Sequence, residues 1–486
     1  MKARAPGRVT AALAAASALA APAAAEAHSF GQLYNLPLPF WMYLYGAAAA
    51  LAASFLAAGW FIGTASTAAR PGRDVSAVGW ARAVRRALPA LRVAGVLVLL
   101  LCIATGLFGN PNPYLNFNMT FFWIVFVLGF AYLAALLGDF YAQLNPWRAL
   151  ADAAARGFAG FAAGRVRYPE RLGYWPAVAL YMGFIWLELL GQVQPRSLSI
   201  VLLAYTALNG AGVWLVGGGA WFRYCEFFSV FFRLIALMAP IECGADGRVR
   251  LRRPFAGILE QRAESVSHLT FALFMLSSTA FDGLRETVAW ANLFWRDLYP
   301  YLKPWVGDNP IAAYPMMRSL HTAFETAGLL LSPFVYLAVF WAFAAAARLI
   351  ARSALPTREL ALRFGLTLLP IALVYNVTHY YTLLLTQGLR IVNLASDPFG
   401  RGWNLLGTAG WLQSPPVPGM SAVWHTQVAL IVAGHIVSVC LAHVEALRAF
   451  PSRGRAMASQ LPMLLLMLLF TTIGLWILSQ PLKPPM

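Results

Sequence analysis

Four of the chain's seven histidines lie between Val377 and His443, in a stretch that is otherwise mostly apolar. His379 stands on one apolar run, and His425, His435 and His443 stand on the next. A histidine inside a lipid-spanning helix is costly, and such residues usually mark a binding site, a proton path or a cofactor. This stretch is therefore where the sequence most strongly indicates chemistry.

Depth along the helices separates these histidines. At a rise of about 1.5 Å per residue, His435 lies about 15 Å below His425, and His443 lies near the cytoplasmic face, so one metal ion cannot bind all three. His379 lies about 13 Å below the outer end of its run, between His425 and His435 in depth. A His379–His435 pair could share a metal, hold a haem or relay protons. The alternative is that each imidazole bonds a backbone carbonyl in a satisfied core.

A second group of candidates lies near the outer ends of the predicted helices. His321 and Glu325 are four residues apart, as are Asp282 and Glu286, so each pair shares a helix face. Nitrogen and oxygen donors there could form a site for copper or another divalent transition metal, from His28, His321, Glu325, His379 and His425. The alternative is that these groups only solvate the helix ends.

Three more polar residues stand out. Glu188 is alone in the apolar run WLELL, where its carboxyl could carry a proton, act as a general acid or pair with an arginine. Asp397 begins a turn that holds Arg401 between two glycines, and this guanidinium suits a phosphoryl or carboxylate oxygen. Equally, Asp397 and Arg401 could pair with each other across the turn.

An apolar scaffold must hold these candidates. The chain has 486 residues, 60% hydrophobic and 11% charged, which is typical of a polytopic membrane protein. Residues 1–27 are typical of a cleavable signal peptide, which leaves one multi-span domain, 28–486. We expect an all-α transmembrane helix bundle of about ten spans, near 40–66, 90–108, 119–138, 174–193, 198–218, 265–282, 322–346, 364–386, 423–445 and 460–480.

Three segments between the spans have their own character. The segment 221–239 is apolar but carries Arg223, Glu226 and Arg233, which predicts an interfacial helix. Two long outer loops are expected, 284–320, rich in Trp and Tyr, and 388–422, rich in Pro and Gly.

The net charge is +17, and the Lys and Arg residues are distributed unevenly between the two sets of predicted loops. If the mature N-terminus is outside and the spans alternate, 25 Lys and Arg fall on the cytoplasmic side and eight outside, as the positive-inside rule requires. This predicts a bacterial inner-membrane protein with both mature ends in the periplasm. The basic charge then reflects topology, so the expected partner is the lipid bilayer and not nucleic acid.

Six motifs carry a resemblance to a known family: HSFGQLYNLPLPFW (28–41), YPERLGYWPA (168–177), STAFDG (278–283), THYYTLLLTQG (378–388), LASDPFGRGWNLLGT (394–408) and VAGHIVSVCLAH (432–443). In these the chain resembles the bacterial integral membrane proteins called fenitrothion hydrolases. The resemblance implies hydrolysis of an organophosphorus triester, which is a small hydrophobic substrate, with release of a nitrophenol.

Phosphotriester hydrolysis usually needs a metal-activated hydroxide and a cation beside the phosphoryl oxygen. The metal could be held near the periplasmic face by His321, Glu325, His379 and Asp282, and the oxygen could be met by Arg401 or Arg390. Two other functions use the same residues. One is a transporter or a protein that handles copper or another transition metal; the other is a haem-binding redox protein with His379 and His435 as axial ligands.

Overall fold

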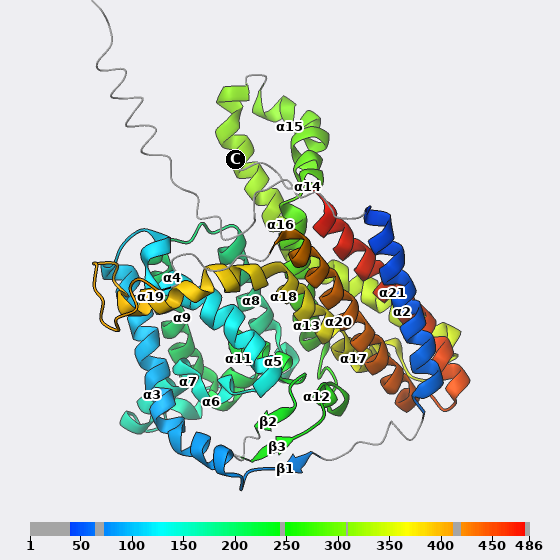
Figure 1. The fold of residues 1–486 in the computed structure, drawn as a ribbon, viewed down its shortest axis with the longest axis horizontal. Coiled ribbons are helices and arrows are strands. Elements are labelled where there is room, and N and C mark those ends of the chain that lie inside the picture. Colours follow the sequence, from blue (N-terminus) through cyan, green and yellow to red (C-terminus); the bar gives the residue numbers. More distant parts are fainter. Residues whose placement is uncertain (1–38, 64–71, 244–247, 308–309, 412–418, 482–486) are drawn as a thin grey trace, which may run out of the picture. The chain divides into compact units, whose positions relative to one another are not determined.

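The computed structural model describes residues 39–63, 72–243, 248–307, 310–411 and 419–481, which Figure 1 shows as a ribbon. The chain divides into two units, Met1–Gln32 and Leu33–Met486. Every described element belongs to the second unit. The predicted signal peptide, 1–27, and His28 lie outside the described residues.

The described residues are almost entirely helical, so the all-α prediction is confirmed. The longer helices are α2 (Phe40–Phe61), α3 (Gly79–Phe108), α7 (Pro146–Gly157), α8 (Trp175–Leu189), α9 (Pro195–Val216), α11 (Phe227–Ala236), α13 (Val266–Arg285), α16 (Pro310–Ile350), α18 (Leu369–Thr386), α20 (Met420–Ala449) and α21 (Arg453–Ser479). Shorter helices are α4 (Phe117–Met119), α5 (Phe130–Leu137), α6 (Tyr141–Leu144), α10 (Gly218–Ala220), α12 (Ala256–Glu260), α14 (Val288–Asn292), α15 (Tyr299–Val306), α17 (Thr357–Phe364) and α19 (Ile391–Ser396).

Tighter or wider helical segments link these helices. The 3-10 segments are η2 (Pro113–Leu115), η4 (Phe161–Ala163), η5 (Glu170–Leu172), η8 (Gly365–Leu368) and η9 (Gly388–Arg390). The π-helical segments are η3 (Thr120–Gly129), η6 (Trp221–Cys225) and η7 (Leu293–Leu298).

Eight helices in the described part of the chain are long and apolar enough to cross a bilayer, which makes this a multi-pass membrane protein. They are Phe40–Phe61, Gly79–Phe108, Phe117–Leu137, Pro195–Val216, Ala312–Ile350, Thr357–Ser396, Ser421–Ala449 and Arg453–Ser479. The prediction of about ten spans is therefore too high. The predicted span near 174–193 is α8, which has only 15 residues. The one near 265–282 is α13, which has 20 residues but many polar side chains.

The helix α13 lies inside the bundle. Every residue from Ser267 to Asp282 is buried, polar ones included. The surrounding elements are α8, α16, α18 and α21, and Figure 1 shows α13 behind α18 and α20. A helix with protein on all sides has no face for lipid, so hydroxyl, imidazole and carboxyl groups can stand on it. This explains why α13 is less apolar than the eight helices that are apolar enough to cross a bilayer.

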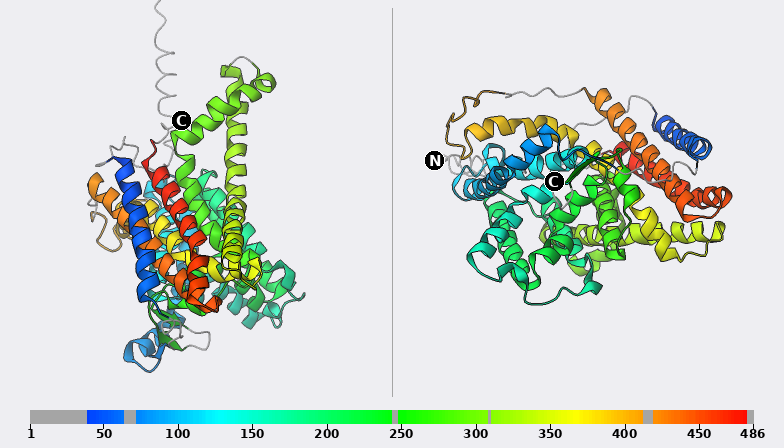
Figure 2. Two further views of the ribbon diagram at one scale, coloured as in Figure 1. Left: turned by 90° about the vertical axis from the view of Figure 1, so that its right-hand side faces the viewer. Right: turned by 90° about the horizontal axis from the view of Figure 1, so that it is seen from below.

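The outer helices form two groups around this axis. On one side α20 packs against α2, α18 and α21, and α21 also contacts α16. On the other side α3 packs against α7 and α9. Figure 2 shows the first group, with α2 in blue and α20 and α21 in orange and red, as a set of steeply inclined helices.

The segment 221–239 is not the interfacial helix that its sequence predicts. It forms η6 and α11, separated at Glu226, and nine of the ten residues of α11 are buried. Its phenylalanines interlock with those of other helices; the ring centroid of Phe228, for example, lies 4.9 Å from that of Phe126 on η3. A helix that is apolar on nearly all sides belongs in a core. Arg223 is exposed, whereas Arg233, in the last turn of α11, is partly buried and donates to the Arg223 carbonyl at 2.8 Å.

Glu226 fastens two helix starts together. Its carboxylate accepts hydrogen bonds from the N–H groups of Phe228 (3.2 Å) and Ser229 (2.8 Å), which are first-turn donors of α11. It also accepts from Asn145 Nδ2 at 3.1 Å and from the Tyr205 hydroxyl at 2.5 Å. Asn145 in turn caps α7. Four donors therefore satisfy a fully buried carboxylate.

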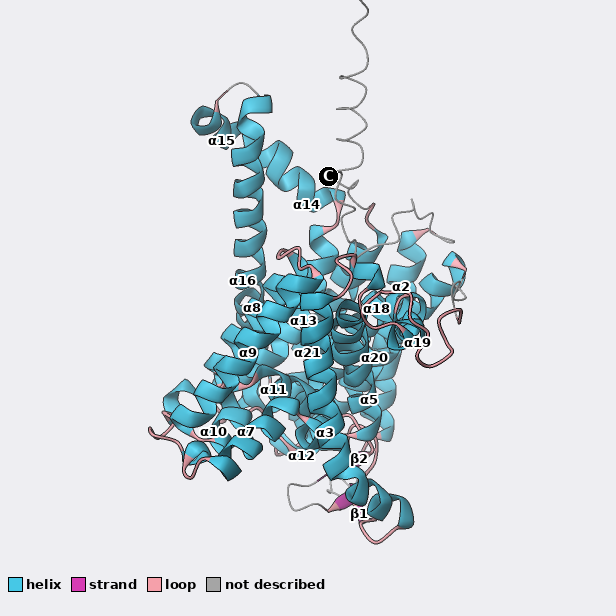
Figure 3. Cartoon of the chain, turned by 90° about the vertical axis from the view of Figure 1, so that its left-hand side faces the viewer, coloured by secondary structure: helices cyan, strands magenta, loops and turns pink. Residues whose placement is uncertain are grey.

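The two predicted outer loops are partly helical, which corrects the expectation of loops. Residues 284–320 form α14, η7, α15 and the first turns of α16, which lie together at one end of the unit (Figure 3). They pack through a small core of their own, centred on Phe294, Ala313 and Met317. The segment 388–422 contains η9 and α19, and its residues 412–418 lie outside the described residues.

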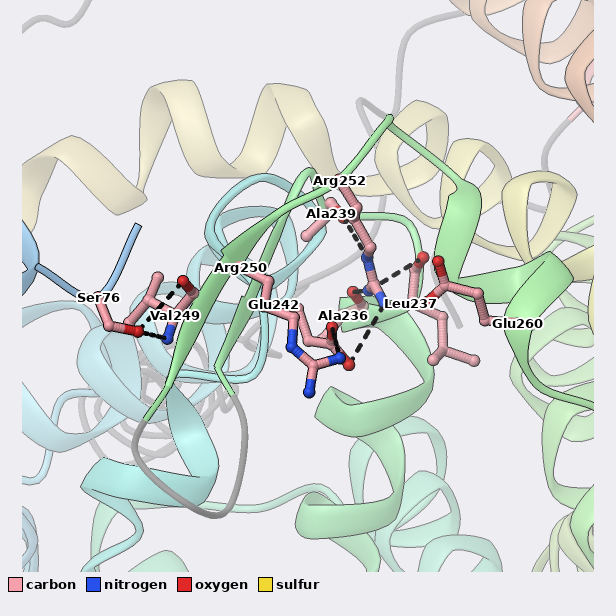
Figure 4. A network of polar contacts seen from close by, with 9 residues as sticks. All are labelled: Ser76, Ala236, Leu237, Ala239, Glu242, Val249, Arg250, Arg252 and Glu260. Atoms are coloured by element: carbon pink, nitrogen blue, oxygen red, sulfur yellow. Dashed lines mark hydrogen bonds and ion pairs between the residues drawn. The ribbon is translucent and has the colours of Figure 1, made fainter. Parts of the chain in front are cut away.

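A small antiparallel sheet of order β1-β3-β2 joins β1 (Arg73–Asp74), β2 (Ile241–Cys243) and β3 (Val249–Leu251). The residue after β3 is the buried Arg252, shown in Figure 4. It donates to the carbonyls of Ala236 (3.0 Å) and Ala239 (3.1 Å) and lies 3.4 Å from the Glu260 carboxylate. These carbonyls stand at the end of α11, so Arg252 supplies donors that the helix end lacks.

Replacement of this arginine tests the arrangement. Arg252→Met leaves the buried carbonyls and Glu260 without their cation, and we expect a loss of about 3–5 kcal/mol in the free energy of unfolding. The matched control is Arg250→Met, since Arg250 is half exposed and pairs with a carboxylate at 3.8 Å; its cost should stay under about 1 kcal/mol. A thiol-reactive dye that reports exposure of the buried Cys102 and Cys225 measures unfolding. Equal costs for both variants would contradict this account.

Candidate functional site

Asp282, near the end of α13, joins two neighbouring side chains of α18. Its Oδ2 lies 2.8 Å from Nε2 of His379 and accepts a 2.8 Å hydrogen bond from the hydroxyl of Tyr380. The Asp282 side chain is 1% exposed, whereas that of His379 is 22% exposed. The carboxylate is therefore sealed in the bundle while the imidazole stays partly accessible.

Close helix packing holds this group in place. The rings of His379 and Tyr380 are nearly perpendicular, with centroids 4.6 Å apart, so both reach the same carboxylate from consecutive positions. A Cβ on Gly283 would lie 2.9 Å from Cγ2 of Ile477 on α21 and 3.9 Å from Cε1 of His379. The glycine thus lets α18 and α21 approach α13 beside the pair.

Arg285, at the end of α13, ties three helices together. Its Nη1 donates to the carbonyl of Leu189, the last residue of α8, at 2.6 Å. Its Nη2 lies 3.1 Å from Oε1 of Glu286, and its Nε lies 3.6 Å from Oε1 of Glu325 on α16. One guanidinium therefore serves a helix end and two carboxylates, with little exposure to solvent.

His321 extends this cluster on α16. Its Nδ1 lies 3.8 Å from Oε2 of Glu325, so the two residues face the same way, as their spacing predicts. The imidazole is stacked on Trp295 (centroids 5.4 Å apart) and meets the edge of Phe294 (4.9 Å). Aromatic rings of η7, from the expected outer loop, thereby enclose this histidine.

Glu188, on α8, lines a cavity of about 20 Å³ in the interior of the bundle. Tyr380 lines the same cavity, as do Ser278, Thr279 and Asn376. Since the Tyr380 hydroxyl donates to Asp282, the cavity and the His379–Asp282 pair share one phenol.

The other histidines of the 377–443 stretch lie apart from this pair along α20. His425 is exposed near the start of the helix, with Nδ1 2.7 Å from the carbonyl of Ser421. His435 is fully buried, and its Nδ1 lies 2.8 Å from the carbonyl of Ile431, one turn earlier. His443 is also buried, two turns further on. For His435 the structure matches the alternative in which an imidazole bonds a backbone carbonyl.

Asp397 and Arg401 form a closed turn. The carboxylate of Asp397 accepts from the backbone N–H groups of Arg401 (2.9 Å) and Gly402 (2.6 Å). The Arg401 guanidinium lies over the rings of Phe399 (5.5 Å) and Trp403 (5.7 Å) and donates to a backbone carbonyl of α3. These contacts hold the turn together, and no ion pair between the two side chains is needed for it.

The residues expected to bind a metal or a haem mostly contact other protein groups. Among the described residues no group of three or more His, Cys, Asp or Glu side chains is placed to hold a metal ion. His321 and Glu325 lie together, but His379 is on Asp282 and His425 is on Ser421. His379 and His435 each use one ring nitrogen within the protein. Among the described residues the donors therefore do not assemble into the expected metal site, and His28 lies outside the described residues.

The fold and the site define a class: a multi-pass helical membrane protein with a buried carboxylate, an imidazole and a phenol joined near the end of α13. Beyond this class, no protein-family model, no curated protein and no solved structure matches the chain.

The sequence places Asp282 and His379 in one possible metal site, but it does not predict their direct contact. The spacing pairs Asp282 with Glu286, whereas in the structure Asp282 contacts His379, 97 positions along the chain. Arg285 was counted only as an outer-loop charge. A signal was present: Asp282 and Arg285 flank Gly283 in a helix that also carries Ser277, Ser278 and Thr279, which is unusual for a lipid-facing helix.

A double-mutant cycle tests the central pair. We expect Asp282→Asn and His379→Gln to be coupled by about 1.5–3 kcal/mol in the free energy of unfolding, because each removes the same charge-assisted hydrogen bond. The control cycle combines Asp282→Asn with His425→Gln, which should be additive because His425 bonds Ser421 instead. Reversible unfolding in mixed micelles gives both values. A coupling as small as that of the control cycle would argue against the pair.

Proposed function

We propose that the chain is a membrane-embedded hydrolase of apolar phosphotriesters and that His379 is its general base. One observation carries the proposal: Nε2 of His379 lies 2.8 Å from Oδ2 of the buried Asp282. A carboxylate on one ring nitrogen fixes the tautomer and orientation of an imidazole and stabilises the imidazolium that forms when the other nitrogen takes a proton. The resemblance to fenitrothion hydrolases supplies the substrate class.

The proposed step is the attack of a water molecule on phosphorus. One proton of that water passes to Nδ1 of His379, its oxygen forms the new P–O bond, and the bond from phosphorus to the aryl oxygen breaks. The aryl group leaves as an aryloxide, which is a weak enough base to depart without a proton donor. Asp282 keeps Nε2–H oriented while Nδ1 takes up the proton, and Oδ2 of Asp282 also accepts a hydrogen bond from the phenol of Tyr380.

For orientation in the cell we propose the bacterial inner membrane with both mature ends in the periplasm. Support comes from the 25 Lys and Arg on one set of connecting segments against eight on the other, when the short α8 and the enclosed α13 are counted as crossings beside the eight long apolar helices. Figure 1 is consistent with this, since the sheet, α6, α7 and α12 lie at one end of the unit and α14 and α15 at the other.

A second candidate is a proton-coupled transporter. The observation that favours it is the position of Glu188 and Asp282 on helices α8 and α13 in the interior of the bundle, where ionisable groups often mark ion paths.

Rates on a chromogenic aryl phosphotriester test the hydrolase. In membranes that carry the wild type we expect release of the coloured phenol, and in His379→Gln a fall of about 10²–10⁴-fold in kcat, the usual range for loss of a general base. Asp282→Asn should also lower kcat, because the amide no longer holds His379 in the tautomer with a proton on Nε2. His425→Gln is the matched control and should retain the wild-type rate. An inactive wild type would rule out the hydrolase, and equal rates in all variants would rule out this site.

A further inference from the structure

The cavity beside Glu188 has two unlike walls. One is aromatic and comes from α8 and α11: Tyr181, Phe184, Phe227, Phe228 and Phe231. The other is polar and comes from α8, α13 and α18: Glu188, Ser278, Thr279, Asn376 and Tyr380. Its volume of about 20 Å³ has room for about one water molecule, which needs roughly 10–15 Å³ and two to four polar partners. The polar wall offers more than that number of partners.

Tyr380 connects this cavity to the His379–Asp282 pair. Its side chain lines the cavity, and its hydroxyl donates to Oδ2 of Asp282 at 2.8 Å. The same Oδ2 lies 2.8 Å from Nε2 of His379. A hydrogen-bonded path therefore runs from the partly accessible imidazole to the buried phenol, and one water molecule in the cavity would continue it to Glu188.

We propose that Glu188 is the proton acceptor at the inner end of this path, so that the proton taken up by His379 moves into the bundle. In the transfer, Nε2–H of the imidazolium gives its proton to Oδ2 of Asp282. The Tyr380 hydroxyl turns from Asp282 to the cavity water and releases its proton there, Asp282 gives its proton to the phenol oxygen, and the water gives one to Glu188. The net change is that His379 is neutral with its proton on Nδ1 and the Glu188 carboxylate is a carboxylic acid, while Asp282, Tyr380 and the water are restored. Before the next turnover the path runs in reverse and Nδ1–H leaves through the accessible face of the imidazole, which restores Nε2–H.

The groups that face Glu188 suit this assignment. Tyr181 is on its own helix, Tyr380 comes from α18, and α11 contributes only Phe227, Phe228 and Phe231. The hydroxyls of the polar wall belong to Ser278 and Thr279 of α13. Arg285, also on α13, donates to the carbonyl of Leu189, the residue that follows Glu188 on α8. The charge of Arg285 is shared with Glu286 and Glu325. The phenol and the hydroxyls can therefore accept or pass a proton, while the guanidinium of Arg285 is held by other carboxylates.

This inference rests on the proposed function for the origin of the proton, but it has a test of its own. Infrared difference spectra of the purified full-length protein, acid minus neutral, should show the carboxylic-acid band of Glu188 in the wild type. The band should be absent in Glu188→Gln and present in Glu359→Gln, a control on α17 whose carboxylate pairs with Arg363 at 3.0 Å. Unfolding midpoints of the variants identify any that fail to fold, and Tyr380→Phe, which keeps Glu188, should slow the appearance of the band.

Kinetics provides the second arm. Glu188→Gln should lower kcat on the chromogenic triester by about 10²-fold with little change in KM, and small weak acids added to the buffer should restore part of it. Glu359→Gln should leave kcat unchanged. An unchanged infrared band in Glu188→Gln would overturn the inference. If the wild type hydrolyses no triester but the band depends on Glu188, the hydrolase fails and the proton site stands.

Discussion

The structure depends on the enclosure of α13. This helix carries Ser267, His268, Thr270 and a Ser-Ser-Thr run before Asp282, all of them buried. In a bilayer such side chains are stable only where protein covers every face of the helix and supplies their partners. The helices α8, α16, α18 and α21 provide that cover, and their own outward faces can be apolar. The interior of the bundle thus holds these polar side chains beside a large apolar core, while the outward faces of the helices carry apolar side chains.

Buried charges at helix ends fix how the helices meet. Glu226 joins the starts of α7 and α11 through Asn145, and Arg252 closes the other end of α11. Arg285 closes the end of α8 while it pairs with a carboxylate of α16. Each of these groups satisfies backbone atoms that a helix end leaves without partners. Since the removal of one member leaves the others buried and unsatisfied, the contacts specify one arrangement of the bundle.

The sequence predicted the class and most outer helices because lipid-facing helices need long apolar runs, which composition reveals directly. It overestimated the spans because enclosure is not visible in a single run: α8 is short and α13 is polar. The burial of α11 was within reach, since four phenylalanines between Phe227 and Phe232 leave no polar face for a membrane surface. The pairing of Asp282 with His379 was not, because it depends on which helices are neighbours and how they are rotated.

The different exposure of the two members of the pair bears on the substrate. Asp282 is sealed while His379 is partly accessible, so a reacting group has to meet the imidazole through its accessible face. An apolar triester partitions into the bilayer and can arrive there without desolvation of a charge. A route inward through Tyr380 to a second carboxylate would return the imidazolium of His379 to its neutral form. The phenol on Asp282 is therefore as important to the proposed chemistry as the imidazole, because it is the contact through which the partly accessible side of the pair meets the interior of the bundle.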